Sequence, residues 1–322
     1  NNAPFDLAAA LAELEALYED VRLGPSTGSI VDAAVQRNIP YRRMTEGSMV
    51  QFGWGSKQKR IQAAETSDTS AIAEAIAQDK ELTKNLLAAA GVSVPIGEVV
   101  TTADDAWRAA QKIGGPIVLK PKDGNQGKGV VANIQTEKEV RAGFEVTQAF
   151  GRETIVERYL PGADYRLLVV GNRLSAAARR EPAQVVGDGK HTVAQLVEKE
   201  NQNPLRGSGY KTPLELIKLE EAEAMFLAQQ GLTFESIPKI GQKIYLRENS
   251  NISTGGDSLD YTDIVPKSYK RIAVKAAKSI GACICGVDMI IKNVNNPYVE
   301  NNYALLELNY NPAIHIHTYP YL

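Results

Sequence analysis

The stretch KPKDGNQGKGV, residues 120–130, carries the sharpest local signal in this 322-residue chain. An apolar run at 117–119 leads into Lys120, and glycines follow at 124, 127 and 129. Glycine lets backbone N–H groups approach phosphate oxygens that a Cβ would keep away, and nearby lysines neutralise a polyphosphate. The spacing matches neither a P-loop nor a dinucleotide-binding turn. We therefore predict a strand and a phosphate-covering loop, with a flexible hairpin as the alternative.

Helices and strands are predicted on both sides of this stretch. Upstream, Asp79 is the expected N-cap of a helix that starts at Lys80 and ends at Gly91, with Leu82, Leu86 and Leu87 facing inward. Strands are expected at 117–120, 130–134, 154–160, 165–170, 286–292 and 303–309, and helices at 136–149, 192–200, 213–229 and 266–280. This order favours α+β lobes over one regular doubly wound sheet.

The first 65 residues predict a small α/β lobe of their own. Apolar residues recur at spacings of three and four in the segment 5–18: Leu7, Leu11, Leu14 and Leu17. This period predicts an amphipathic helix with its apolar stripe turned inward. A second helix opens at Gly24-Pro-Ser-Thr, with Ser26 or Thr27 as its cap, and a strand follows at 41–44.

Acidic residues lie inside the last two predicted strands. Asp288 occurs in GVDMII, and Glu307 and Asn309 occur two apart in LLELN, so their side chains project from one face. A carboxylate in apolar surroundings is costly to bury unless a cation or a donor pairs with it. Three oxygen ligands on neighbouring strands suit Mg²⁺ that bridges ATP phosphates. The alternative is a set of structural carboxylates paired with arginine.

Two further segments offer nucleotide and substrate contacts. The segment VERYLPGADYR, residues 156–166, can present backbone groups to an adenine edge, while Glu157 and Asp164 can accept from its amino group and from a ribose hydroxyl. Arg166, Arg179 and Arg180 follow, and RENSNISTGG at 247–256 is a polar loop. Such groups suit carboxylate recognition and the charge of a phosphoryl transfer, although lone arginines are usually solvated.

The composition excludes several classes of protein. The 36 basic and 38 acidic residues leave a net charge of -2, so the chain lacks the positive field of a nonspecific nucleic-acid binder. No run approaches the roughly 20 apolar residues that cross a bilayer. Cys283 and Cys285 predict reduced core thiols, which favours a cytoplasmic location. His315 and His317 have no third zinc ligand nearby in the sequence, so we expect a structural or substrate-adjacent role for them.

In their order, the motifs resemble the ATP-grasp superfamily over nearly the whole chain: Asp79-Lys80, Lys120-Pro, the glycine loop, Glu157 to Asp164, Asp288 and Glu307-Leu-Asn309. The resemblance implies an α+β ATP-grasp fold that uses ATP and Mg²⁺. It implies a lobe and linker at residues 1–65, and an ATP-grasp domain at 66–322 with a mobile lid subdomain at about 115–160. Because the chain opens at Asn1 without Met, we expect a segment of a longer protein.

The resemblance also implies roles for particular residues. Those expected to hold ATP phosphates are Lys80, Lys120, Gly124, Asn125, Gln126, Gly127 and Gly129. Those expected at the adenine and ribose are Glu157, Arg158, Tyr159, Leu160 and Asp164. The implied magnesium ligands are Asp288, Glu307 and Asn309, and the implied catalytic residues are Arg180, which would stabilise an acyl phosphate, with Lys128 and Arg166. The implied substrate-binding residues are Arg247, Ser250, Asn251, Ser253, Thr254, Gly255 and Gly256.

Other segments resemble the central part of the cyanophycin synthetase family: LGPST at 23–27, VQFGWG at 50–55, VVGDG at 185–189 and STGG at 253–256. That resemblance implies a homo-oligomer, a tetramer or a dimer, that extends a poly-aspartate backbone. The C-terminal carboxylate of this polymer would take the γ-phosphoryl group of ATP, and the amine of aspartate would displace phosphate. In the complete family, an additional Mur-ligase-like half attaches arginine and needs a P-loop. This chain has no P-loop sequence, so we do not expect it to attach arginine.

The segment ELNYNPA at 307–313 more closely resembles the glutathione-synthetase half of bifunctional glutathione enzymes. The implied alternative substrates are γ-glutamylcysteine and glycine. In both cases the partners are a small amino acid and a peptide or polymer acceptor. Two alternatives of another class are a regulatory module that binds ATP without turnover and a kinase that leaves a stable phosphorylated product.

Overall fold

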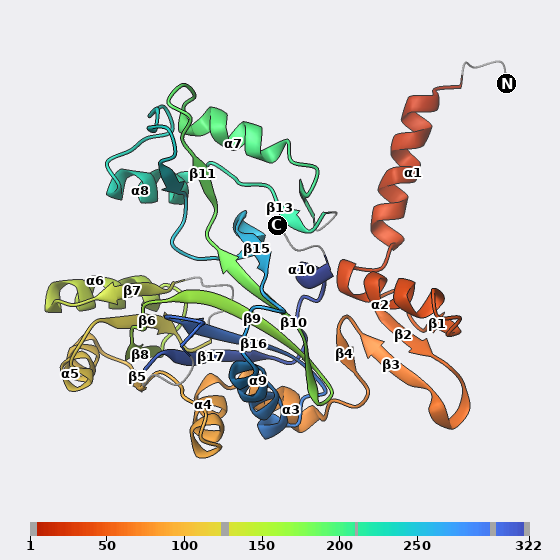
Figure 1. Ribbon diagram of the computed structural model, residues 1–322, viewed down its shortest axis with the longest axis horizontal. Coiled ribbons are helices and arrows are strands. Elements are labelled where there is room, and N and C mark those ends of the chain that lie inside the picture. Colours follow the sequence, from red (N-terminus) through yellow and green to blue (C-terminus); the bar gives the residue numbers. More distant parts are fainter. Residues whose placement is uncertain (1–4, 124–128, 210–211, 297–300, 319–322) are drawn as a thin grey trace.

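The computed structural model describes residues 5–123, 129–209, 212–296 and 301–318 (Figure 1). It opens with helix α1 (Leu7–Val21), which begins where Asp6 accepts a hydrogen bond from the amide of Ala9. None of the residues of α1 is buried, and the four leucines of its stripe are 56–62% exposed. The predicted inward stripe is therefore wrong for this chain. The period predicted the apolar face correctly, but α1 extends away from the body of the molecule (Figure 1).

A small lobe follows, built from α2 (Pro25–Val35) and an antiparallel sheet in the order β1-β2-β3-β4. The strands are β1 (Tyr41–Arg43), β2 (Met49–Phe52), β3 (Lys59–Gln62) and β4 (Glu65–Thr66), with a 3-10 turn, η1 (Gly55–Lys57), between β2 and β3. Val31, Val50 and Ile61 form its core. The predicted cap is wrong, because Gly24 is the N-cap and makes no side-chain bond. Ser26 instead accepts from the amide of Ile314 at 3.1 Å, which ties the lobe to the C-terminal segment.

The next part is a four-stranded antiparallel sheet in the order β5-β8-β6-β7, here called the lid sheet. Its strands are β5 (Gly97–Val100), β6 (Ile117–Pro121), β7 (Val131–Ile134) and β8 (Thr154–Arg158). Helices α5 (Ala103–Ile113) and α6 (Glu137–Gln148) cover one face over a core that includes Leu119 and Val156. Because strand side chains alternate, Lys120 and Glu157 project from the opposite face.

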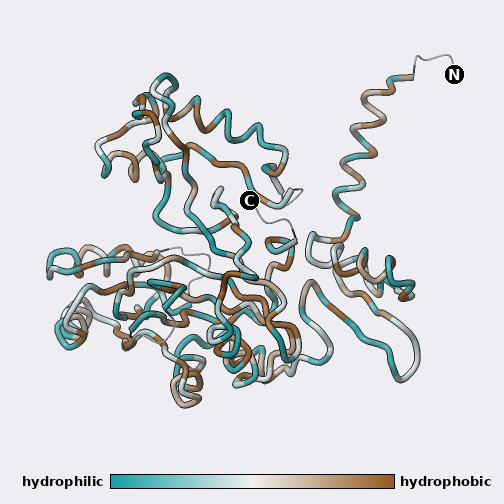
Figure 2. Tube along the Cα trace, in the orientation of Figure 1, coloured by the Kyte–Doolittle hydropathy of each residue, from teal (hydrophilic) through white to brown (hydrophobic). Residues whose placement is uncertain are grey.

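The largest sheet is five-stranded and antiparallel, in the order β15-β10-β9-β16-β17, here called the central sheet. Its strands are β9 (Ala163–Val170), β10 (Arg173–Glu181), β15 (Asp257–Asp260), β16 (Ile284–Ile291) and β17 (Tyr303–Asn309). One face packs on α9 (Lys267–Ile280), with α3 (Ala71–Gln78) and α4 (Lys80–Ala89) alongside. Figure 2 shows apolar segments gathering in this sheet, whereas polar and apolar residues alternate along α1.

Several helix predictions are confirmed at the level of single residues. Asp79 caps α4 by accepting from the amides of Glu81 and Leu82, and Leu87 is fully buried. The prediction that Leu82 faces inward is wrong, since this side chain is 42% exposed.

The two cysteines are free thiols, as predicted. Cys285 is buried in the core of the central sheet, and Cys283 is half-buried.

A further subdomain, at the top of the view in Figure 1, follows β10 in the chain. It contains β11 (Gln184–Val186), which pairs with β14 (Lys243–Tyr245), and the helices α7 (Val193–Asn201) and α8 (Glu221–Gln229). The short strands β12 (Arg206–Gly207) and β13 (Leu214–Glu215), the turn η2 (Ile252–Thr254) and α10 (His315–Thr318) complete the described elements. The predicted helix at 213–229 is wrong in its first half, because Leu214 and Glu215 pair with β12. The helix starts at Glu221, where Glu220 and Glu223 form a capping box. Within the described ranges, no helix combines the length and apolarity needed to span a membrane.

Candidate functional site

Charged residues from four strands meet on the face of the central sheet that lies opposite α9. The strand register brings them together: Asp288 on β16 lies between Arg166 on β9 and Glu307 on β17, and Asp164 on β9 pairs with Arg180 on β10. Asn309 lies two residues beyond Glu307 on the same strand. Residues that are up to 145 positions apart in the chain, from 164 to 309, therefore form one site.

Asp288 is at the centre of this site and is only 3% exposed. Arg166 donates to both carboxylate oxygens of Asp288, from Nε to Oδ1 and from Nη2 to Oδ2, the latter at 2.7 Å. Arg180 also donates to Oδ2, at 3.1 Å. Burial alone would raise the pKa of Asp288, but the two guanidinium groups outweigh it and lower the pKa to about 2. The two guanidinium groups thus favour the ionised form of Asp288.

Arg180 bridges two carboxylates. Its Nη2 donates to both oxygens of Asp164, at 2.7 and 2.9 Å, as well as to Asp288. Burial opposes its charge, but Asp164 and Asp288 outweigh that and raise the pKa of Arg180 above its ordinary value. Ser250 donates to Asp164 at 2.5 Å, so both oxygens of Asp164 are engaged by protein donors here. The role of Asp164 at a ribose stays a prediction.

Glu307 differs from Asp288 in its electrostatic surroundings. Burial, and after it the negative charge of Asp288, raise the pKa of Glu307. Asn309 lies beside it, with its Nδ2 donating to Glu307 Oε1 at 3.4 Å. A buried carboxylate whose ionised form is disfavoured gains from a cation placed between it and its neighbour.

The predicted trio fits magnesium by its donor chemistry. No described part of the chain gathers three or more His, Cys, Asp or Glu side chains in a metal-binding cluster. Two carboxylates and one amide oxygen are hard ligands in a small number, which suits an ion that keeps several of its waters. The trio suits zinc less well, because protein zinc sites are built mainly from cysteine and histidine and the trio contains neither.

A second charged group, here called the lysine cluster, consists of Lys80 and Lys84 on α4, Lys120 on β6 and Glu157 on β8. Lys120 donates to Glu157 Oε1 at 2.6 Å, and Lys84 donates to Oε2. Burial would raise the pKa of Glu157, but the two lysines lower it. Burial lowers the pKa of Lys80, and Glu307 is the strongest influence that opposes this. Lys80 therefore lies within electrostatic reach of the predicted metal ligands.

The segment predicted to contact adenine, residues 157–160, already makes hydrogen bonds within the protein. The side chain of Arg158 donates to the carbonyl of Ile113 at 2.9 Å, and the amide of Tyr159 donates to the carbonyl of Pro116 at 2.8 Å. These bonds tie the end of β8 to the last residue of α5 and to the segment that connects α5 and β6. Both oxygens of Glu157 accept from lysines, so a contact between this side chain and adenine stays a prediction, as do contacts with the carbonyl of Arg158 and the backbone of Leu160.

Most of the predicted glycine loop lies outside the described residues: Gly124, Asn125, Gln126, Gly127 and Lys128. Gly129 is described, with φ +71°, and a Cβ added there would lie 2.6 Å from the ring of Phe150 and 2.9 Å from Pro121. Glycine is thus required at 129 both by backbone conformation and by space.

Ser250 of the predicted substrate loop contacts the charged face directly, through Asp164. Arg247 is instead held in an ion pair with the buried Glu223 of α8. The carbonyl of Asn251 accepts from the amides of Thr254 and Gly256 at 3.1 Å each, which closes the turn. Ser253 is exposed, and Gly255 has φ +87°. These residues shape the loop that presents Ser250, and their contact with substrate stays a prediction.

Two residues gain importance from the structure. Sequence reasoning did not include Lys84, although its spacing of four from Lys80 on one helix places both on one face. His317 lies beside the charged face, and its Nε2 is buried without a hydrogen-bond partner in the described part of the chain. Burial, followed by the charges of Arg166 and Arg180, lowers the pKa of His317 to about 4.

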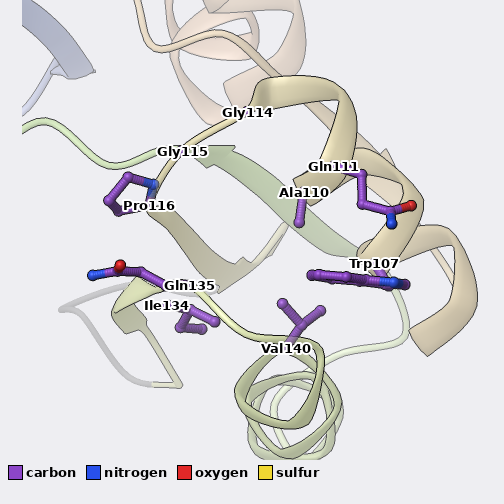
Figure 3. A pocket seen from close by; sticks show the side chains of 9 residues that line it. All are labelled: Trp107, Ala110, Gln111, Gly114, Gly115, Pro116, Ile134, Gln135 and Val140. Atoms are coloured by element: carbon purple, nitrogen blue, oxygen red, sulfur yellow. The ribbon is translucent and has the colours of Figure 1, made fainter.

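A separate pocket does not belong to this site. It is lined by Trp107, Gln111, Pro116, Gln135 and Val140, among others, and lies between α5 and the start of α6 (Figure 3). That is the helix-covered side of the lid sheet, whereas Lys120 and Glu157 project from the other side. The pocket therefore offers no access to the charged residues.

Comparison with known proteins finds ATP-grasp sequences along this chain. A profile described as an ATP-grasp domain matches residues 72–163. The glutathione biosynthesis bifunctional protein GshAB of Clostridium perfringens is 43% identical over 309 residues, covering 94% of this chain and 40% of that protein. A cyanophycin synthetase of a Nostoc species is 39% identical over 316 residues, covering 98% of this chain and 35% of that protein.

The solved structures give a matching result. The crystal structure of a bifunctional glutathione synthetase from Pasteurella multocida superposes with a TM-score of 0.72 at 36% identity, covering 93% of this chain and 41% of that one. The chain thus spans 35–41% of the length of these three relatives.

Proposed function

Because the chain belongs to the ATP-grasp superfamily, we propose that it activates a carboxylate as an acyl phosphate and joins it to an amine. The observation that carries this proposal is the juxtaposition of the lysine cluster with the face that holds Asp288 and Glu307. Lys80 couples the two groups electrostatically, since Glu307 and Glu157 both oppose the lowering of its pKa by burial. A triphosphate bound by the lysines would present its terminal phosphate to the carboxylates and arginines.

Asp288, Glu307 and Asn309 are the residues that would hold Mg²⁺. When bound, the ion would neutralise charge on the transferring phosphoryl group. The chain's own contribution is to keep these ligands in register on β16 and β17 and to hold Asp288 ionised through Arg166.

The arginines suit the stabilisation of an anionic intermediate. Arg166 and Arg180 are held by carboxylates rather than extended into solvent, and their side chains are 10% exposed. Groups fixed in this way need little reorganisation when charge develops on an acyl phosphate or on the tetrahedral adduct that forms from it. Arg180 is the residue we assign to the acyl phosphate.

For the substrates, the first candidate reaction adds L-aspartate to the C-terminal carboxylate of a cyanophycin poly-aspartate backbone. Support comes from the 39% identity to cyanophycin synthetase and from the Gly-Pro-Ser-Thr segment, whose Ser26 contacts the segment that follows β17. The second candidate joins γ-glutamylcysteine to glycine. It is favoured by the 43% identity to the bifunctional glutathione protein and by the sequence 307–313. We further propose a cytoplasmic homo-oligomer, a tetramer or a dimer.

The test is a phosphate-release screen with Mg²⁺ and ATP. One arm contains aspartate with a poly-aspartate primer, and the other contains γ-glutamylcysteine with glycine. A ligase releases phosphate only when acid and amine are both present, and the active arm identifies the substrates. ATP binding without turnover in any arm would favour a regulatory module, and a stable phosphorylated product formed without amine would identify a kinase.

A further inference from the structure

Glu157 is an unusual carboxylate because two lysines share it. It is 3% exposed and accepts from Lys120 through one oxygen and from Lys84 through the other. The lysine side chains are themselves only 15% and 13% exposed. One buried negative charge therefore holds two buried positive charges that come from different elements, β6 and α4.

Lys120 cannot keep its full interaction with Glu157 when it also contacts the phosphates of a bound nucleotide. A triphosphate attracts Lys120, and a lysine that moves towards phosphate weakens its bond to Glu157. A buried carboxylate that loses its only cation is strongly destabilised. Without a second cation, Glu157 would therefore compete with the phosphates for Lys120.

We propose that Lys84 is a positioning residue for nucleotide binding, which keeps Glu157 neutralised and so frees Lys120 to contact the phosphates. This inference rests on the proposed function, because it takes Lys120 as a phosphate ligand. Lys84 itself stays with Glu157 in this arrangement.

The surroundings of Lys84 fit a fixed cation rather than a mobile one. It lines a pocket between α4 and the edge of the lid sheet together with Val94, Pro95, Ile96 and Ile155. The side chain of Lys84 is only 13% exposed, and its ammonium group donates to Glu157. Gly97 on β5 allows the backbone to pass close to Glu157, since a Cβ at position 97 would lie only 2.7 Å from the Cβ of Glu157. The close approach of β5 thus fixes the position of the carboxylate that Lys84 must reach.

The lysines differ in a way that supports this division of roles. Lys80 and Lys84 lie one turn apart on α4, but Lys80 is the one near Glu307 and Asp123. Burial, followed by repulsion from Lys120, lowers the pKa of Lys84 to about 8, while Glu157 opposes this. The repulsion between Lys84 and Lys120 would be relieved when Lys120 moves to a phosphate.

The experiment measures binding of Mg-ATP, ADP and adenosine by calorimetry, in the absence of acid and amine substrates. Lys84→Met should weaken ATP and ADP binding by about tenfold or more, equivalent to about 1.4 kcal/mol, and leave adenosine unchanged. Lys84→Arg should retain most of the affinity. Lys112→Met on α5, at a lysine whose side chain is 77% exposed, is the matched control and should have no effect.

A double variant distinguishes positioning from direct contact. In a Glu157→Gln background Lys120 is no longer held by a carboxylate, so adding Lys84→Met should then cost less than about twofold in ATP affinity. An equal loss in both backgrounds, or an equal loss for adenosine, would overturn the inference. If the original chain binds no ATP at all, the proposed function itself fails, whereas normal ATP binding by Lys84→Met refutes only the role of Lys84.

Discussion

Glu307→Gln is expected to separate metal binding from folding. In the metal-free protein, burial and the adjacent Asp288 raise the pKa of Glu307. A carboxyl with a raised folded-state pKa costs stability as pH rises through that pKa, because the unfolded chain ionises more easily. Glutamine keeps the size of the side chain and removes its charge. The metal-free variant should therefore be at least as stable as the original chain at neutral pH.

The opposite result is expected with Mg²⁺ and ATP. A ligand that binds only the folded state adds about 2.7 kcal/mol at one hundred times its Kd. At roughly 2–4 °C per kcal/mol for a domain of about this size, this raises the Tm by about 5–11 °C. Glu307→Gln should lose most of that rise, since it removes one of the two carboxylates in the trio. Thermal unfolding at saturating ATP and increasing Mg²⁺ measures the difference.

The control is Glu145→Gln on α6, an exposed glutamate on the lid. It should match the original chain with and without Mg-ATP. The metal assignment is refuted if Glu307→Gln keeps the full Mg²⁺-dependent rise in Tm. A loss of several kcal/mol in the metal-free variant would show instead that Glu307 is a structural carboxylate.

Three further changes test the site and its support. Arg166→Met should lower the free energy of unfolding by about 3–5 kcal/mol, because it removes the two-point partner of a buried carboxylate, and adding Asp288→Asn should recover part of it in urea denaturation. Gly97→Ala should destabilise the lid and weaken ATP binding, whereas Gly115→Ala, whose Cβ meets nothing within 4 Å, should do neither; equal effects of the two would contradict the packing argument. With its folded pKa lowered to about 4 by burial and the arginines, His317 should cause stability to fall as pH drops from 6.5 towards 4, where only the unfolded chain takes up the proton. His317→Gln should flatten that part of the pH profile, and an unchanged profile would contradict the shift.

The features that were predicted correctly from the sequence have a local signal. The Asp79 cap, the boundaries of α9 and the alternation on β17 each depend on residues within a few positions of one another, and the structure has all three. The placement of Asp288, Glu307 and Asn309 on neighbouring strands was predictable for the same reason, because a polar residue inside an apolar strand is visible in the sequence, while their binding of magnesium stays a prediction.

Pairings between distant elements were not predictable in this way. The ion pair between Arg247 and Glu223 is one example, because nothing in either segment indicates that α8 lies beside that loop. Lys84 was missed because its partner Glu157 is 73 residues away and joins it only through the packing of α4 against the lid sheet. The apolar stripe of α1 illustrates the same limit, since a period identifies a face but not the surface that covers it.

The arrangement of charge in the site favours one orientation of a metal-bound triphosphate. The lysine cluster holds three cations against one anion: Lys80, Lys84, Lys120 and Glu157. The face of the central sheet holds three anions against two cations: Asp164, Asp288, Glu307, Arg166 and Arg180. Under the proposed function, the first group would stabilise phosphates and the second would stabilise Mg²⁺, while the reverse orientation would place each beside like charge. The whole chain carries a net charge of only -2, so this polarity arises from strand register and helix packing rather than from composition.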